Sequence, residues 1–304
     1  MDMKQIPLTT RYWQATLLAV LTLLLAACSS SDDYQWDPWD YSNAEKATVN
    51  VVAEDGTVED LESGTTLGLY VTGDDGQVRL VSAKVDADGN IQLPSGALSG
   101  KVVVYAPFQS AWGVEAYNGN KLFEVQPDQS DEAGYEASDL MIGAATTISK
   151  TRAASMELSM HHMLSKVMIH IVDETGSLDM ENMTMRLLRM EGTVNVSLSN
   201  MSVSTVENSL LDIDMLRQGA NDHRITMVAI VAPQTKAEGE KLFEFGTAGA
   251  QHICKLPSDA TLEGGKTFVF QLRFTEEGLV PDSSYITNWE ADDIETDLSV
   301  RVKK

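Results

Sequence analysis

The chain has 304 residues, with 22 Lys and Arg against 45 Asp and Glu, which gives a net charge of −23. This acidic balance, without blocks of Lys or Arg, argues against a protein that binds nucleic acid or anionic membrane surfaces through charge. Hydrophobic residues make up 43% of the chain, and its length suffices for one large domain or two medium ones.

The chain begins with a short apolar segment that ends at Cys28. Lys4 and Arg11 precede an apolar stretch that is too short to span a bilayer but has the length of a signal-peptide core. The run Leu-Ala-Ala-Cys at its end resembles the signal of bacterial lipoproteins, in which the cysteine becomes the acylated first residue. We therefore expect residues 1–27 to be a signal peptide, cleavage between Ala27 and Cys28, and a lipid on Cys28. An ordinary secretory signal is the alternative.

Residues 28–45 are predicted to be an acidic tether. The serines and aspartates directly after Cys28 resemble the signal that sends lipoproteins of the Bacteroidetes to the outer cell surface. Acidic linkers also occur simply because charge keeps a chain solvated. The aromatic and acidic residues 34–41 show neither helical nor strand periodicity. We expect a protein anchored to the cell outer membrane by lipid and exposed on the surface, with this tether as a stalk.

The next residues alternate as strands do. In residues 47–53 valines and alanines share one face, and further strands are predicted at 67–71, 78–85 and 101–106. Asp-Gly pairs between these apolar runs predict hairpin turns. The acidic run 86–90 has a partial calcium-loop pattern, but its Gly comes too early and no Glu closes it, so a hairpin turn explains it better.

Later strands have a clearer pattern. Alternating apolar residues predict strands around 167–171, 194–198 and 268–274, and the nearly continuous run 225–231 predicts a central strand covered on both faces. Helical signals are confined to a turn or two. The two stretches that could hold such turns are residues 133–141 and 210–219.

Strands at short intervals with turn residues between them predict an all-β protein built of β-sandwiches. The polar stretch around residues 146–154 is the best candidate boundary, with similar numbers of predicted strands on each side. We therefore predict two sandwich domains in tandem, residues 46–150 and residues 151–304.

No catalytic or metal-binding pattern stands out. His161 and His162 are adjacent, so on a strand they point to opposite faces and cannot both bind one metal ion. Cys254 lacks a partner once Cys28 carries lipid, and we expect it to be buried and inert. No serine lies in a Gly-x-Ser-x-Gly turn. We expect no enzyme, no metal and no cofactor, with a hydrolase whose carboxylates are brought together by the fold as an alternative.

Four segments, in this order, resemble the fimbrillin family, the pilus-building lipoproteins of Bacteroidales. In that family a short Asp-Leu run precedes a His-x-Leu-Ser/Ala-Lys strand start, a Pro-Gln follows a buried strand, and an Ile-x-x-Trp comes near the end. The matching segments here are residues 138–141, 160–167, 231–235 and 286–289.

The resemblance implies two tandem transthyretin-like β-sandwich domains and a role as a stalk, anchor, accessory or tip subunit of fimbriae. It implies other fimbrial subunits as partners through strand exchange, and host or bacterial surface molecules as further candidates. In polymerising members a protease cuts after a basic residue near the start and removes a strand, which opens a groove for a strand of the next subunit. Lys46 is the sole basic residue between positions 12 and 78 and is the candidate cleavage site.

The end of the chain suits the donated strand. Its apolar and polar residues alternate, although an edge strand of its own domain is an equally good interpretation. Cutting after Lys46 would free an acidic, proline-bearing stretch that makes a poor strand. We therefore favour an anchor or accessory subunit that keeps Cys28 over a stalk subunit that loses it. The candidate donor residues on one face are Ile294, Thr296, Leu298, Val300 and Val302.

A surface glycan-binding lipoprotein is the main alternative function. Such a protein needs aromatic side chains on which sugar rings can stack. The loop after Phe108 contains Trp112 and Tyr117 together with Gly and Asn, which makes this pair the best candidate for a glycan contact.

Overall fold

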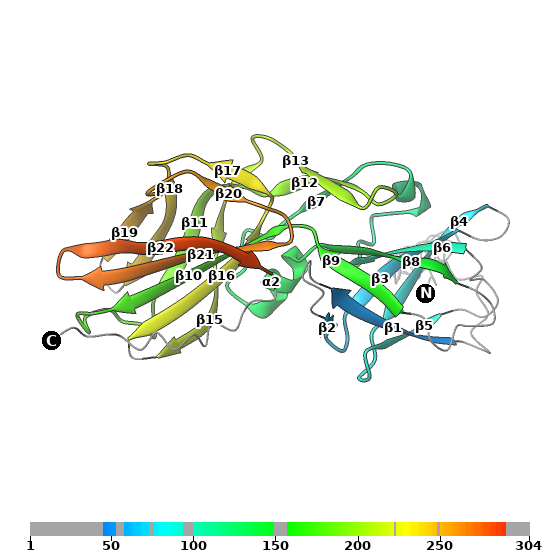
Figure 1. The fold of residues 1–304 in the computed structure, drawn as a ribbon, viewed down its shortest axis with the longest axis horizontal. Coiled ribbons are helices and arrows are strands. Elements are labelled where there is room, and N and C mark those ends of the chain that lie inside the picture. Colours follow the sequence, from blue (N-terminus) through cyan, green and yellow to red (C-terminus); the bar gives the residue numbers. More distant parts are fainter. Residues whose placement is uncertain are drawn as a thin grey trace, which may run out of the picture. The chain divides into compact units, whose positions relative to one another are not determined.

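Strands dominate the computed structural model of the protein, which confirms the all-β prediction (Figure 1). The model describes residues 45–52, 58–72, 76–93, 100–148, 157–221, 223–247 and 250–289. All of these residues lie in one compact unit, Trp39–Lys304. Within them, no helix is both long and apolar enough to cross a membrane.

The first half of the chain builds an eight-stranded sheet. Its order is β2-β1-β9-β8-β6-β3-β4, with β5 paired to β1, and all pairs are antiparallel except β1 with β9. A turn joins β4, the last strand of this order, to β5, which pairs with β1 near the other end, so the sheet nearly closes on itself. Its strands are β1 Glu45–Val52, β2 Val58–Asp60, β3 Thr66–Thr72, β4 Val78–Lys84, β5 Asn90–Leu93, β6 Gly100–Ala106, β8 Met141–Ile148 and β9 Glu157–His162.

The turn at residues 86–90 is built by Asp86. Its carboxylate accepts hydrogen bonds from the backbone N of Asp88 and of Asn90, at 3.0 and 2.9 Å, and Gly89 takes a φ of +74°. The predicted turn is therefore confirmed. The prediction of a hairpin is wrong here, because β4 pairs with β3 and β5 pairs with β1.

The second half of the chain packs two sheets face to face. One has the order β15-β16-β10-β21-β22 and the other β14-β11-β18-β19, and apolar side chains from both line one core. The predicted central strand is β16, which pairs with β15 on one side and β10 on the other. The strands are β10 Ser165–Asp173, β11 Thr184–Glu191, β14 Leu210–Asp214, β15 Leu216–Asn221, β16 Arg224–Val231, β18 Lys241–Thr247, β19 Ala250–Lys255, β21 Lys266–Thr275 and β22 Gly278–Asn288.

The two predicted helical stretches have different outcomes. Residues 133–141 overlap the helix α2, Glu132–Ser138, whose first turn is capped by the Asp131 carboxylate accepting from the backbone N of Gly134 at 2.8 Å. The prediction for residues 210–219 is wrong, because they form β14 and β15. Ile213 of β14 and Met215, which lies between the two strands, are buried, and the pairing of β14 with β11 and of β15 with β16 outweighs local helix preference.

Strand pairing crosses residue 150 in both directions. β9 joins the eight-stranded sheet although it follows that position, and β7 pairs with β12 of the second half although it precedes it (Figure 1). Residues 149–156 lie outside the description, so the domain boundary remains a prediction. The remaining elements are β7 Lys121–Glu124, β12 Thr193–Ser197, β13 Ser202–Thr205, β17 Gln234–Lys236, β20 Ala260–Leu262 and the 3-10 turn η1 Val114–Tyr117.

A buried glutamine ties the segment before α2 to the five-stranded sheet. Gln129 is fully buried, and its side-chain amide donates to the backbone O of Ile230 and accepts from the backbone N of Ile230, both at 2.8 Å. The pairing of β15 with β16 ends at Leu216 and Val228. The Gln129 amide therefore takes the place of a strand beside Ile230.

We predict that Gln129→Ala lowers the free energy of unfolding by about 2–4 kcal/mol, because it leaves two buried backbone groups without partners. Urea denaturation followed by circular dichroism measures this change. Gln251→Ala, at an exposed position of β19, is the control and should unfold at the same urea concentration as the unchanged chain. Equal stability of the two variants would contradict the role given to Gln129.

Candidate functional site

Two of the four family-like segments meet at the end of β9. His162 is the last residue of this strand, and Asp139 directly follows α2. The Nδ1 atom of His162 lies 2.7 Å from Oδ1 of Asp139, and the two side chains are only 7% and 16% exposed. This ion pair or charged hydrogen bond joins α2 to the chain as it passes from the eight-stranded sheet into the five-stranded one.

The fourth segment reaches the same place through Trp289. The Trp289 ring stacks on the His162 ring, with centroids 4.1 Å apart and planes 13° from parallel. On the sheet side, Lys166 Nζ lies 5.1 Å from the centroid of the Trp289 ring, and Thr267 Oγ1 donates to the backbone O of Trp289 at 3.3 Å. We call these five residues, Asp139, His162, Lys166, Thr267 and Trp289, the Trp289 anchor.

Backbone hydrogen bonds fix the segment between β9 and β10 inside this anchor. The backbone N of Met163 donates to the O of Leu140 at 2.8 Å, and the backbone N of Gly265 donates to the O of Leu164 at 2.7 Å. Ser165 Oγ also donates to the backbone O of Glu263 at 2.8 Å. The chain is therefore held from both sides where it changes sheets.

A cavity of about 620 Å³ lies beside the anchor. Apolar side chains such as Leu61, Phe108 and Met141 form much of its wall, and Glu62, Glu136, Asp139 and His162 supply its charged groups. Burial, followed by the hydrogen bond and charge of Glu62, raises the pKa of Glu136. These two carboxyl groups are direct neighbours, whereas a glycosidase holds its two carboxylates about 5 to 9.5 Å apart across the scissile bond. The pair therefore does not resemble that catalytic arrangement.

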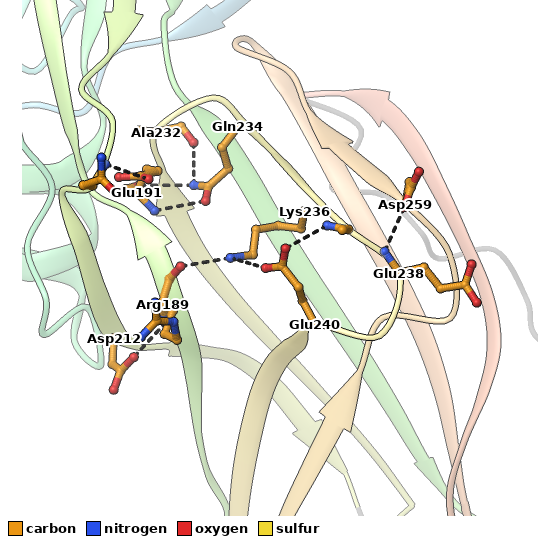
Figure 2. A network of polar contacts seen from close by, with 11 residues as sticks. Arg189, Glu191, Asp212, Ala232, Gln234, Lys236, Glu238, Glu240 and Asp259 are labelled. Atoms are coloured by element: carbon orange, nitrogen blue, oxygen red, sulfur yellow. Dashed lines mark hydrogen bonds and ion pairs between the residues drawn. The ribbon is translucent and has the colours of Figure 1, made fainter.

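The third family-like segment has a structural role elsewhere. Figure 2 shows the Gln234 side chain reaching β11, where its Oε1 accepts from the backbone N of Glu191 at 3.0 Å. Its Nε2 donates to the backbone O of Ala232 at 2.8 Å and to the O of Glu191 at 3.2 Å. Gln234 thus links the end of β16 to β11 of the facing sheet.

The same part of β11 contains a bulge. Arg189 has a φ of +52°, and its backbone N donates to the Asp212 carboxylate at 2.8 Å (Figure 2). The nearly buried Lys236 Nζ donates to the backbone O of Arg189 at 3.0 Å and pairs with Glu240 at 2.9 Å. The hydrogen bond from Lys236 lowers the pKa of Glu240. The charged groups of Lys236, Glu240 and Asp212 therefore have partners within the protein, as expected of a structural network.

The predicted glycan-contact pair is packed against the core. Trp112 is 5% exposed and its ring centroid lies 5.1 Å from that of Tyr105. Tyr117 is half-buried, with its ring 5.8 Å from that of Tyr70. Trp112 therefore offers no open ring face for a sugar in this arrangement.

The predicted metal and thiol features behave as structural residues. His161 is exposed while His162 is buried in the Trp289 anchor, so the two rings point apart. Among the described residues, no group of three or more His, Cys, Asp or Glu side chains could hold a metal ion. Cys254 is buried in β19, and burial raises the pKa of its thiol to about 11, which makes it unreactive at neutral pH.

The predicted lipidation, cleavage and donor residues lie mainly outside the description. Cys28 and Ala27 precede its first residue, and the candidate donor residues 294–302 follow its last. Lys46 is described and lies in β1, where its backbone is paired with Gln92 of β5.

We predict a coupling free energy of about 0.5–1.5 kcal/mol between His162 and Trp289, from their ring stacking. A double-mutant cycle of His162→Ala and Trp289→Ala, measured by urea unfolding, gives this value. His162→Phe keeps a ring on Trp289 but loses the Asp139 contact, so it should destabilise less than His162→Ala. Additive effects of the two alanine substitutions would contradict the stacking role.

The residues of this site lie within a region of the chain that matches a known family. The model of the fimbrillin-like family matches residues 57–289. No curated protein matches the chain in sequence.

Three solved structures share the fold at low identity. A candidate cell adhesion protein of Bacteroides ovatus is 16% identical with a TM-score of 0.60, covering 80% of this chain and 96% of its own. One of Bacteroides uniformis is also 16% identical, with a TM-score of 0.57 and coverage of 80% and 98%. The tip fimbrial protein Mfa3 of Porphyromonas gingivalis is 10% identical, with a TM-score of 0.51 and coverage of 81% and 100%.

The family match spans most of the chain, including every residue of the Trp289 anchor and the Gln234 contact. Fimbrillin-like proteins are non-enzymatic structural proteins of fimbriae and cell adhesion, in agreement with the expectation that the chain is not an enzyme. The chain belongs to the fimbrillin-like family.

Proposed function

We propose that the chain is a structural subunit of cell-surface fimbriae that is anchored in the outer membrane by a lipid on Cys28. The observation that carries this proposal is the family match over residues 57–289. In this proposal the subunit consists of the signal peptide, the acidic tether and two tandem transthyretin-like sandwich domains, and it joins other subunits by β-strand addition.

The position of Lys46 favours an anchor or accessory subunit over a stalk subunit. Proteases cut most readily in exposed, unpaired segments, whereas the backbone of Lys46 is in a ladder with β5. A cut after Lys46 would remove only two residues of β1 and leave 47–52, with Ala47, Val49 and Val51 buried. Removing two residues would not open a groove long enough to accept a strand of another subunit.

An open sheet edge offers another route to subunit contact. β22 is 11 residues long, and among the described strands it pairs only with β21. Tyr285 and Ile286 on this edge are 36% and 45% exposed. An edge of this length presents unpaired backbone groups that an extended strand of a neighbouring subunit can bind.

The candidate donor strand suits such an edge only if ladder hydrogen bonds form. Burying its four aliphatic side chains is worth roughly 6–12 kcal/mol. Ordering nine residues costs about 1–2 kcal/mol each for the backbone. A preformed acceptor edge with unpaired backbone groups therefore decides whether residues 294–302 can bind a neighbour.

We predict that the mature protein isolated from cells begins at Cys28 and carries acyl chains, because the Lys46 bond is held in a strand ladder. Mass spectrometry of the N-terminal peptide measures this. Cys28→Ala should move the protein out of the membrane fraction, while Cys254→Ala, at the buried thiol, should leave it there. An N-terminus at Ala47 would contradict the anchor role and support a stalk subunit.

We also predict that Tyr285→Lys combined with Ile286→Lys reduces the amount of this chain in sheared fimbriae by about tenfold or more, since each side chain contributes over 1 kcal/mol when buried. Quantitative immunoblotting of the fimbrial and whole-cell fractions measures the ratio. Leu122→Lys, at an exposed apolar position of β7, is the matched control and should not change it. Equal incorporation of both variants would argue against β22 as the contact.

A further inference from the structure

The cavity beside the Trp289 anchor lies between α2 and one end of the eight-stranded sheet. Val51 of β1, Ala106 of β6 and Met141 of β8 line it from the sheet, and Ala137 lines it from α2. Its volume of about 620 Å³ lies within the range of about 300–1,000 Å³ that small-molecule sites have. The cavity is therefore large enough for a small ligand or for a long side chain of another molecule.

The inner wall of the cavity is apolar and buried. Val51, Ala106 and Met141 are only 3%, 1% and 8% exposed although they line it. Leu61 and Phe108 add further apolar surface to the same wall. Covering apolar surface with an apolar chain removes both from water, so this wall favours a ligand that has such a chain.

Apart from His162, the ionisable groups of the cavity are acids. Glu62, Glu136 and Asp139 line it, and of the described residues in its lining none is Lys or Arg. The side chains of Glu62 and Glu136 are hydrogen-bonded neighbours, and the other charges that act on Glu136 come from Glu132 and Asp139. Acids held this close repel one another when they are ionised, and a cation between them removes that repulsion. The charge of the cavity therefore favours a positively charged ligand.

His162 adds a hydrogen-bond acceptor to the wall of the cavity. Its side chain is 7% exposed, and its Nδ1 lies 2.7 Å from the Asp139 carboxylate. When Nδ1 donates its proton to that carboxylate, the Nε2 atom of the neutral ring is an acceptor. Nε2 is buried and has no hydrogen-bond partner among the described residues. A ligand that donates hydrogen bonds therefore suits this wall better than one that only accepts them.

We propose that the cavity is a binding site for an alkylammonium group, that is, a primary ammonium on an apolar chain. The ammonium lies at the carboxylates of Glu62, Glu136 and Asp139, and the chain lies along the apolar inner wall. Two sources have this chemistry, a free alkylamine and the lysine side chain of a peptide, and the experiment separates them. The site is independent of the proposed fimbrial role and goes beyond it.

Isothermal titration calorimetry of the full-length protein tests the site with three small probes. Hexylamine has both the charge and the chain, methylamine has the charge alone, and 1-hexanol has the chain alone. We expect hexylamine to bind about tenfold more tightly than either of the others, or better, because it alone gains from both the apolar wall and the carboxylates.

A peptide probe, acetyl-Gly-Lys-Gly-amide, separates the two sources. Binding of this peptide together with hexylamine would support the proposal and assign the site to lysine side chains as well as free amines. Binding of hexylamine without the peptide would support the proposal and assign the site to free amines.

Substitutions locate the ligand within the cavity. Glu62→Gln combined with Glu136→Gln should weaken hexylamine binding by about fivefold or more, because two carboxylates near the ammonium lose their charge. Ala137→Phe fills the cavity from α2 and should abolish hexylamine binding. Glu132→Gln removes an acid of the same helix that does not line the cavity, so this matched control should bind hexylamine as the unchanged chain does.

Four outcomes would overturn the proposal. Absence of hexylamine binding would remove the site altogether. Methylamine binding as tight as that of hexylamine would mean that the acidic surface attracts cations without a site. Equal affinities of the double glutamine variant and Glu132→Gln would mean that the ammonium lies elsewhere. Hexylamine binding retained by Ala137→Phe, with the variant folded by circular dichroism, would place the chain outside the cavity. None of these outcomes affects incorporation into fimbriae, which the β22 variants measure separately.

Discussion

The stack of Trp289 on His162 is the contact on which the rest of the arrangement depends. Asp139 contacts the His162 ring and Lys166 lies against the Trp289 ring. The stack lies where the chain passes from the eight-stranded sheet into the five-stranded one. The same contact also holds the end of β22. The same side chains therefore fix both the passage from β9 to β10 and the position of Trp289 directly after β22. A charged hydrogen bond and an aromatic stack in a mostly buried place give this junction a defined geometry that backbone pairing alone would not.

Strand pairing makes the two halves of the protein interdependent. β9 follows the predicted boundary but lies parallel to β1, and β7 precedes it but pairs with β12. Gln129 adds a further link by replacing a strand beside Ile230. Separating the two halves therefore requires breaking strand ladders and buried polar contacts, not merely extending a flexible linker.

The sequence predicted those features that depend on local periodicity. Val49 and Val51 of β1 alternate with polar residues, and Phe268 and Phe270 of β21 share one face, so the periodicity predicts these strands and their buried faces. The helical prediction for residues 210–219 is wrong because their charged residues and Gly219 hide the alternation of Ile213 and Met215. Pairings over long separations had no local signal: Asp139 and His162 are 23 residues apart, and Gln129 and Ile230 are 101 apart. The burial of Trp112 against Tyr105 likewise depends on packing that spacing does not reveal.

We propose that this fimbrillin-like chain meets neighbouring subunits through the edge of β22. An electron cryomicroscopy map of fimbriae isolated from cells, with this subunit located by a tag, tests this contact. We expect an extended strand of a neighbouring subunit hydrogen-bonded along β22. A map in which the β22 edge faces solvent, while the neighbour binds elsewhere on the subunit, would contradict it.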